Sequence, residues 1–376
     1  MTQLEPLDPA TLARLSPAAQ KALAPGPGRM MASRGLLPLP RPAELAAVLY
    51  QLAATDAAVA AGAQATADGL PEKVVAGVLA DPEADPRVLA WLSARAATVP
   101  ALFEALVLNP ATADATIVAL AARGNAAQVD LIANNEQRLL RCPDVIAAMY
   151  GNPHARMSTV DRAVELAVRN QVKVTGIAAW DELARVVSAG GGGPATDGDA
   201  TFAQALAGVA TVADSAVLTG SADDAVEVAD GEDQAPPVDE KKVPIGKMTV
   251  PMKIRLATLG NAFARGILIR DPLRLVAVAA IKAPGVTELE AAKYAGNHSL
   301  ADDVVRYIAG RRDWTRLYGI KKSLVMNPKT PITESSKLLV HLRDNDIRLV
   351  AKSKGVPSAV VAQARKLLAQ RTSGGK

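Results

Sequence analysis

The stretch SLVMNPKTPITESSKLLVHL, residues 323–342, holds the pattern that decides the fold, an Asn or Asp followed by Pro between two apolar runs of helical periodicity. The side chain of such an Asx can accept a hydrogen bond from the free amides of a helix start, and Pro at the first helical position loses no hydrogen bond. Each copy therefore predicts the start of a helix. The copies are Asp81-Pro82, Asn109-Pro110, Asn152-Pro153, Asp271-Pro272 and Asn327-Pro328.

The spacing of these copies predicts a repeat. Pro82 and Pro110 lie 28 residues apart, and Pro272 and Pro328 lie twice that distance apart. This length suits one pair of helices per unit, and stacked helix pairs form an α-solenoid, a fold that usually provides a binding surface. We therefore expect an all-α protein built of two helical-repeat arrays.

The composition favours packed helices, and it indicates in which cellular compartment the protein is located. Of the 376 residues, 49% are hydrophobic and only 3% aromatic, so the core must consist of small and branched aliphatic side chains. Cys142 is the single cysteine, which fits a reducing compartment. The first thirty residues lack the pattern of an export signal, and the apolar run of residues 275–281 is far shorter than the ~20 residues of a membrane span. We expect a cytoplasmic protein with no membrane partner.

Charge is distributed unevenly along the chain. Residues 1–185 carry 16 basic and 18 acidic side chains, and residues 186–240 carry 11 acidic and no basic ones. Residues 241–376 carry 26 basic and 9 acidic side chains. The overall charge of +4 does not reveal this local excess of positive charge. An asymmetry of this kind says more about partners than the total does.

The same patterns predict the domain organisation. The Gly, Ala and Asp content of residues 188–242 is typical of a flexible linker, and the periodic runs lie on either side of it. The expected parts are a poorly patterned lead-in at 1–40, a helical-repeat array at 41–187, the acidic linker at 188–242, a basic helical-repeat array at 243–370 and a disordered tail at 371–376.

Two stretches resemble a known group of proteins. They are ANNEQRLLRCPDVIAAMYGNPHARMSTVDRAVELAVRN, residues 133–170, and SLVMNPKTPITESSKLLVHLRDNDIRLVAKSKGVPSAVVAQARKLL, residues 323–368. Both look like uncharacterised helical-repeat proteins of delta-class proteobacteria, and the chain is more loosely similar to HEAT-like and leucine-rich-repeat-variant α-solenoids. The resemblance covers most of both arrays but not the linker, and it implies a fold without an activity.

The motifs of common enzymes and metal sites are absent from the sequence. No HExxH, paired CxxC or GxxxxGK[ST] occurs. His298 upstream of Asp302 and Asp303 suits the capped start of a helix better than a metal site, and Cys142 before Pro143 has no general base that we can assign. We therefore expect a protein that is not an enzyme and that holds no cofactor or metal.

The basic array is the candidate interaction surface. Its Lys and Arg residues recur once or twice per predicted helix, so a shared face would form a positive groove for an acidic protein or a nucleic-acid backbone. We expect a scaffold or adaptor that binds an acidic protein partner. A HEAT-like nucleic-acid-binding protein is the alternative, and the acidic linker is a further candidate ligand that would shield the groove. The expected contact residues are Arg265, Arg270, Arg274, Arg306, Arg311, Arg312, Trp314, Arg316, Lys321, Lys322 and Lys329.

Overall fold

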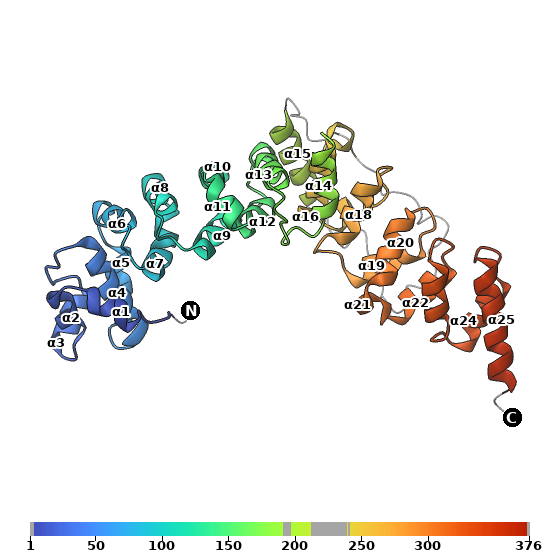
Figure 1. Cartoon of the computed structure of the whole chain (residues 1–376), viewed down its shortest axis with the longest axis horizontal. Coiled ribbons are helices and arrows are strands. Elements are labelled where there is room, and N and C mark those ends of the chain that lie inside the picture. Colours follow the sequence, from blue (N-terminus) through green and yellow to red (C-terminus); the bar gives the residue numbers. More distant parts are fainter. Residues whose placement is uncertain (1–3, 191–196, 212–238, 240, 374–376) are drawn as a thin grey trace. The chain divides into compact units, whose positions relative to one another are not determined.

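The chain is all-helical throughout the part that the structure describes (Figure 1). This part of the computed structural model comprises residues 4–190, 197–211, 239 and 241–373, and it contains no strand. The predicted all-α class is therefore confirmed.

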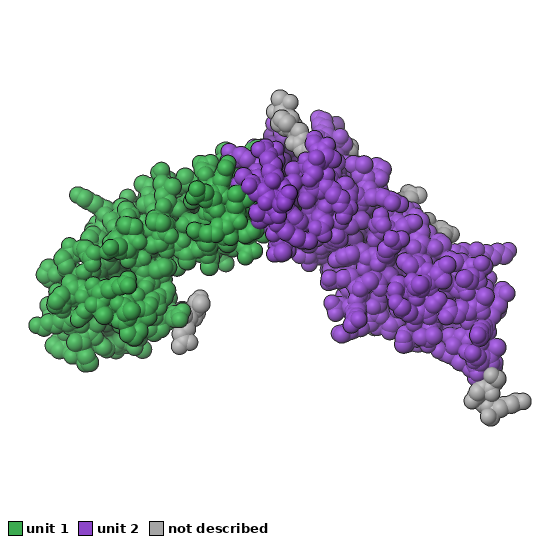
Figure 2. All heavy atoms as spheres, in the orientation of Figure 1, with its two compact units in different colours: residues 1–159 green, residues 160–376 purple. Residues whose placement is uncertain are grey.

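Two compact units divide the chain at a different place from the expected linker (Figure 2). Unit 1 is Met1–Thr159 and unit 2 is Val160–Lys376, so the division falls within helix α13 (Met157–Arg169). Much of the expected linker, at 191–196, 212–238 and 240, lies outside the described residues, as do 374–376 of the expected tail.

Helices in unit 1 pack mainly on their near neighbours in sequence. Helix α4 contacts α5 and α6, α8 contacts α6 and α7, and α9 contacts α10 and α12. Contacts that reach only the next one to three elements are typical of a stacked repeat array. The helices are α1 (Pro9–Arg14), α2 (Pro17–Leu23), α3 (Pro27–Ser33), α4 (Pro42–Thr55), α5 (Ala60–Asp68), α6 (Glu72–Leu79), α7 (Pro86–Ala96), α8 (Pro100–Leu108), α9 (Asp114–Arg123), α10 (Ala126–Ala133), α11 (Glu136–Arg141) and α12 (Asp144–Tyr150).

Unit 2 continues from α13 with the same local pattern of packing. Helix α16 contacts α14, α15 and α18, α19 contacts α20 and α22, and α25 contacts α23 and α24. Its further elements are α14 (Trp180–Ser188), α15 (Gly198–Ala210), the 3₁₀ helix η2 (Ile245–Lys247), α16 (Val250–Leu259), α17 (Ala262–Leu268), α18 (Arg274–Lys282), α19 (Glu288–Gly296), α20 (Asp302–Gly310), α21 (Arg312–Thr315), α22 (Tyr318–Met326), α23 (Ile332–Leu339), α24 (Asp344–Lys352) and α25 (Ser358–Ser373).

The Asx-Pro copies mark helix ends, so the prediction that each starts a helix is wrong. Asn109 ends α8, and α9 begins only at Asp114. In every copy the Asx oxygen accepts a hydrogen bond from the amide two residues later, which makes an Asx turn. These bonds come from Glu83 to Asp81 (2.9 Å), Ala111 to Asn109 (2.8 Å), His154 to Asn152 (2.8 Å), Leu273 to Asp271 (2.9 Å) and Lys329 to Asn327 (3.0 Å).

Helix starts of the expected kind do occur, at two Asx-Pro pairs that the repeat pattern did not include. Asp8 accepts a bond from the Thr11 amide at 2.7 Å and precedes Pro9, the first residue of α1. Asp85 accepts one from the Arg87 amide at 2.9 Å at the start of α7. The chemistry of the cap was therefore right, but applied to the wrong pairs.

Buried asparagines join successive repeats. The side-chain amide of Asn109 donates to the carbonyls of Leu79 (2.7 Å) and Asp81 (2.9 Å), about 30 residues earlier. Asn327 donates in the same way to Ala295 (2.9 Å) and Asn297 (3.2 Å). A helix end leaves carbonyls without intrahelical partners, and these amides satisfy them where water is excluded.

Part of the expected linker is a helix that packs onto unit 2. In α15 the side chains of Phe202, Ala205 and Val209 are buried, and α15 contacts α16. The side chain of Asn261 donates to the Val209 carbonyl at 3.1 Å. The spacing of three and four residues between the buried side chains explains this packing. The rest of the linker that is described comprises residues 188–190 at the end of α14, residues 197 and 211 beside α15, and residues 239, 241 and 242 before η2.

Candidate functional site

Several of the expected contact residues are committed to bonds inside unit 2. Arg265 is 5% exposed, and its guanidinium makes two hydrogen bonds of 2.9 Å to the Glu290 carboxylate and one to the Gly260 carbonyl. Arg270 donates to the Gly266 carbonyl at 2.6 Å. Because Arg265 is buried and bonded to Glu290 and Gly260, it does not face a partner. The expectation that Arg265 is a contact residue is therefore wrong.

Two of the expected lysines neutralise neighbouring groups. The Lys322 ammonium lies 3.1 Å from an Asp346 oxygen, with both side chains 14% exposed. Lys329 donates to the Leu300 carbonyl at 2.6 Å and lies 4.0 Å from Asp302. Both lysines therefore bind groups within unit 2. A count of basic residues does not show which of them are bonded in this way.

Trp314 does not present a free ring. It is 8% exposed and meets the edge of Tyr307 with the ring centroids 6.0 Å apart. The guanidinium of Arg311 covers it, 5.4 Å from its centroid, and is 6.0 Å from that of Tyr307. Cation–π contacts of this kind fix the position of the arginine without cancelling its charge.

A smaller set of the expected residues remains available. Arg306, Arg311, Arg312 and Arg316 are exposed, and Lys321 is half-buried. Within the described ranges no carboxylate forms an ion pair with any of these five, whereas Arg274 lies 3.7 Å from Asp303. We name the set the α20–α22 basic cluster, and it consists of Arg306, Arg311, Arg312, Arg316 and Lys321.

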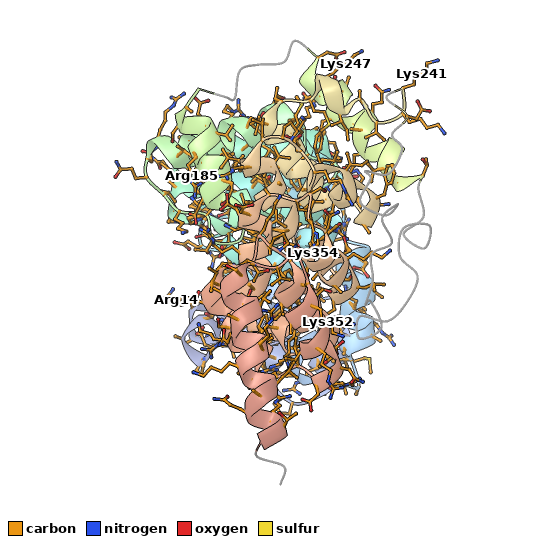
Figure 3. All side chains as sticks on the ribbon, turned by 90° about the vertical axis from the view of Figure 1, so that its right-hand side faces the viewer. Arg14, Arg185, Lys241, Lys247, Lys352 and Lys354 are labelled. Carbon is orange, nitrogen blue, oxygen red and sulfur yellow. The ribbon has the colours of Figure 1, made fainter. Side chains whose placement is uncertain are left out.

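Other exposed cations of unit 2 fall outside this cluster. In Figure 3 the side chains of Lys241 and Lys247 project from the segment that precedes α16, whereas Lys352 and Lys354 belong to the end of α24 and the turn after it. These residues provide natural controls for charge alone.

Arg343 is a functional candidate that the expected set omitted. It is exposed, and its guanidinium lies over Tyr318, 4.5 Å from the ring centroid. The Arg343 amide also donates to the Tyr318 hydroxyl at 2.9 Å. The sequence signal for this pair was weak because the two residues are 25 positions apart.

Charged side chains of α13, α15 and α16 interact around the buried Arg255. Arg255 is fully buried, and its guanidinium lies 4.8 Å from the centroid of the Phe202 ring. Burial raises the pKa of Asp161 to about 7, against the opposing charge of Arg255 and with the help of Asp199 and Glu165. The contact between Arg255 and the Phe202 ring joins α16 to α15.

The comparisons with known proteins place no restriction on the function. No family model, curated protein or solved structure matches this sequence. Among the helices of the described residues, none is both long enough and apolar enough to traverse a lipid bilayer.

Proposed function

We propose that the protein is a non-enzymatic scaffold that binds an acidic protein partner through the α20–α22 basic cluster and acts in the cytoplasm. The observation that carries the proposal is the guanidinium of Arg311, which rests 5.4 Å above Trp314 while Arg312 and Arg316 lie exposed beside it in sequence. A positioned guanidinium pays little further entropy when it binds a carboxylate. The cytoplasmic setting is supported by the single cysteine, Cys142.

The aromatic rings of this surface are buried or covered by cations, which supports a protein partner over a nucleic acid. Single-stranded nucleic acids gain much of their affinity from bases stacked on free aromatic faces. Trp314 is buried, and the Tyr307 ring has Arg311 at 6.0 Å and the Lys282 ammonium at 5.9 Å. A ligand of this surface therefore meets charge and hydrogen-bond donors, which carboxylates satisfy.

A titration tests the proposal against its alternative. The full chain is titrated into a fluorescent poly-glutamate peptide and, separately, into a single-stranded oligonucleotide, at several salt concentrations. The triple variant Arg311→Gln, Arg312→Gln, Lys321→Gln should bind the peptide at least about tenfold more weakly, since several exposed pairs of up to about 1 kcal/mol are lost. The matched control removes three exposed lysines elsewhere in unit 2 with Lys241→Gln, Lys242→Gln and Lys247→Gln.

The outcomes separate the two functions. Tight peptide binding that the first variant weakens and the control preserves supports the proposal. Tighter oligonucleotide binding, with a log-linear salt dependence whose slope the first variant reduces, supports the nucleic-acid alternative. Equal losses in both triple variants would show that net charge alone drives binding.

A further inference from the structure

We infer that the ligand of this surface is an extended acidic segment that spans two repeats, from the α20–α22 basic cluster to Arg343, with carboxylates three residues apart. This inference rests on the proposed function. It adds the conformation of the partner, the spacing of its acidic residues and a contact residue, Arg343, outside the cluster.

Two arginines at helix starts carry the first step. Arg311 is the N-cap residue of α21 and Arg343 is the N-cap residue of α24. Each guanidinium lies over an aromatic ring, Trp314 at 5.4 Å and Tyr318 at 4.5 Å. Two neighbouring turns thus present an arginine whose side chain is held by a ring.

Tyr318 connects the two turns. It is the first residue of α22, two positions after Arg316, and its hydroxyl accepts the Arg343 amide at 2.9 Å. The start of α22 and the start of α24 therefore lie at the same edge of unit 2, and these two helices pack against each other. The exposed Arg316 and Arg343 consequently belong to one strip of positive charge.

The two carboxylates nearest to Arg343 in sequence are largely neutralised. Asp344 makes a 2.6 Å ion pair with Arg371. Burial alone would raise the pKa of Asp346, but hydrogen bonds from Tyr318 and Lys322, with the charges of Lys322 and Arg343, lower it. Asp346 is thus already bonded to two donors, and it leaves Arg343 with hydrogen-bonding capacity for an external carboxylate.

The spacing of the repeats sets the spacing of the ligand. Axes of packed helices lie about 8–10 Å apart, and an extended chain in the polyproline II conformation advances about 3.1 Å per residue with three residues per turn, so side chains three residues apart face the same side. One helix spacing therefore corresponds to about three residues of extended chain. A carboxylate that binds Arg316 places the carboxylate three residues later at Arg343.

Two peptides of equal composition test the inference. Both are twelve residues of Gly and Ser with three Glu, spaced as Glu-x-x-Glu-x-x-Glu in one and contiguous in the other, and both carry the same dye. Fluorescence anisotropy against the full chain at low salt should give a dissociation constant about two- to fivefold lower for the spaced peptide, the size of one partly exposed ion pair. Arg343→Gln should abolish that preference and Lys247→Gln should keep it.

The remaining outcomes overturn the inference in distinguishable ways. If Arg311→Gln weakens both peptides while Arg343→Gln changes neither, the proposed function stands but the ligand spans one repeat only. If neither peptide binds, or no variant alters binding, the proposed function itself fails. If an oligonucleotide binds more tightly than both peptides and Arg343→Gln weakens it, the strip takes phosphates and the peptide inference falls. Thermal unfolding by circular dichroism must match wild type for each variant used.

Discussion

The side-chain amide of Asn152 donates hydrogen bonds of 2.8 Å to the carbonyls of Ala121 and Gly124, at the turn that ends α9. Its side chain is fully buried, and its oxygen meanwhile accepts the amide of His154. The Asn152 side chain thus forms hydrogen bonds both within its own turn and to the turn at the end of α9.

Asn152→Ala should destabilise unit 1 by about 2–4 kcal/mol, because it leaves two carbonyls of a buried helix end without donors. Urea unfolding and hydrogen exchange of the segment around Ala121 measure the loss. Asn170→Ala is the control, since its side chain is exposed and donates to the Leu166 carbonyl of α13, the helix that Asn170 follows. Equal exchange rates in both variants would contradict the role of the buried asparagine.

The buried pair Arg265–Glu290 should show strong coupling. Arg265→Met alone should cost about 3–5 kcal/mol because it leaves the Glu290 carboxylate buried without its main partner. The double variant Arg265→Met, Glu290→Gln should recover part of this loss, since it removes the uncompensated charge and retains a group that can bond Thr287. A double-mutant cycle in urea measures the coupling, and additive losses would exclude it.

Asp161 should make stability depend on pH. Its pKa rises from 3.8 in the unfolded chain to about 7 in the folded protein, so the folded state holds the extra proton between these values. Stability should therefore fall as pH rises from about 4 to 7 and level off above 7, by on the order of 4 kcal/mol in total.

Asp161→Asn removes this dependence. The difference in unfolding free energy between the variant and wild type should grow from pH 5 to pH 8 in favour of the variant, as followed by urea unfolding at each pH. Asp199→Asn should shift the transition to lower pH, because the charge of Asp199 helps to raise the pKa of Asp161. A constant difference across pH would show that Asp161 titrates normally.

Gly208 and Gly310 should respond oppositely to alanine. A Cβ on Gly208 would lie 2.3 Å from the backbone oxygen of Lys242, whereas one on Gly310 would meet nothing within 4 Å. Gly208→Ala should therefore loosen the contact between α15 and the chain before η2, while Gly310→Ala should be neutral or raise stability by up to about 1 kcal/mol. Hydrogen exchange around residues 241–243 gives the comparison, and unchanged protection in Gly208→Ala would refute the close approach.

The helical class followed from the sequence because apolar residues recur at three- and four-residue intervals in both units. The helix boundaries did not follow, because Asx before Pro favours two local structures. At Asp85 it caps the start of α7, and at Asn109 it makes a turn after α8. Asp81 and Asp271 make the turn with a carboxylate, whereas at Asn109 the side-chain amide also donates to a distant partner, the carbonyl of Leu79. A local pattern contains no information about that partner.

The candidate surface was only partly predictable, because counting charges does not indicate burial. Arg265 stands in the apolar run AFARGIL, and all but one of the seven residues of α17 are buried. That isolation, together with the capping-box sequence Thr287 to Glu290, was the available sign of an internal ion pair. Arg343 lacked a comparable sign, since the ring beneath it comes from the previous helix pair.

The asparagine bonds between turns also bear on how arrays of this kind change in evolution. Asn109 and Asn327 each bond to a single turn about 30 residues earlier. Each of these two junctions therefore involves only two adjacent helix pairs. Duplication or loss of one whole pair would recreate the same junction on either side of the change. Slippage by a few residues would instead bury an amide beside the wrong backbone, so we expect the length of such arrays to change by whole helix pairs.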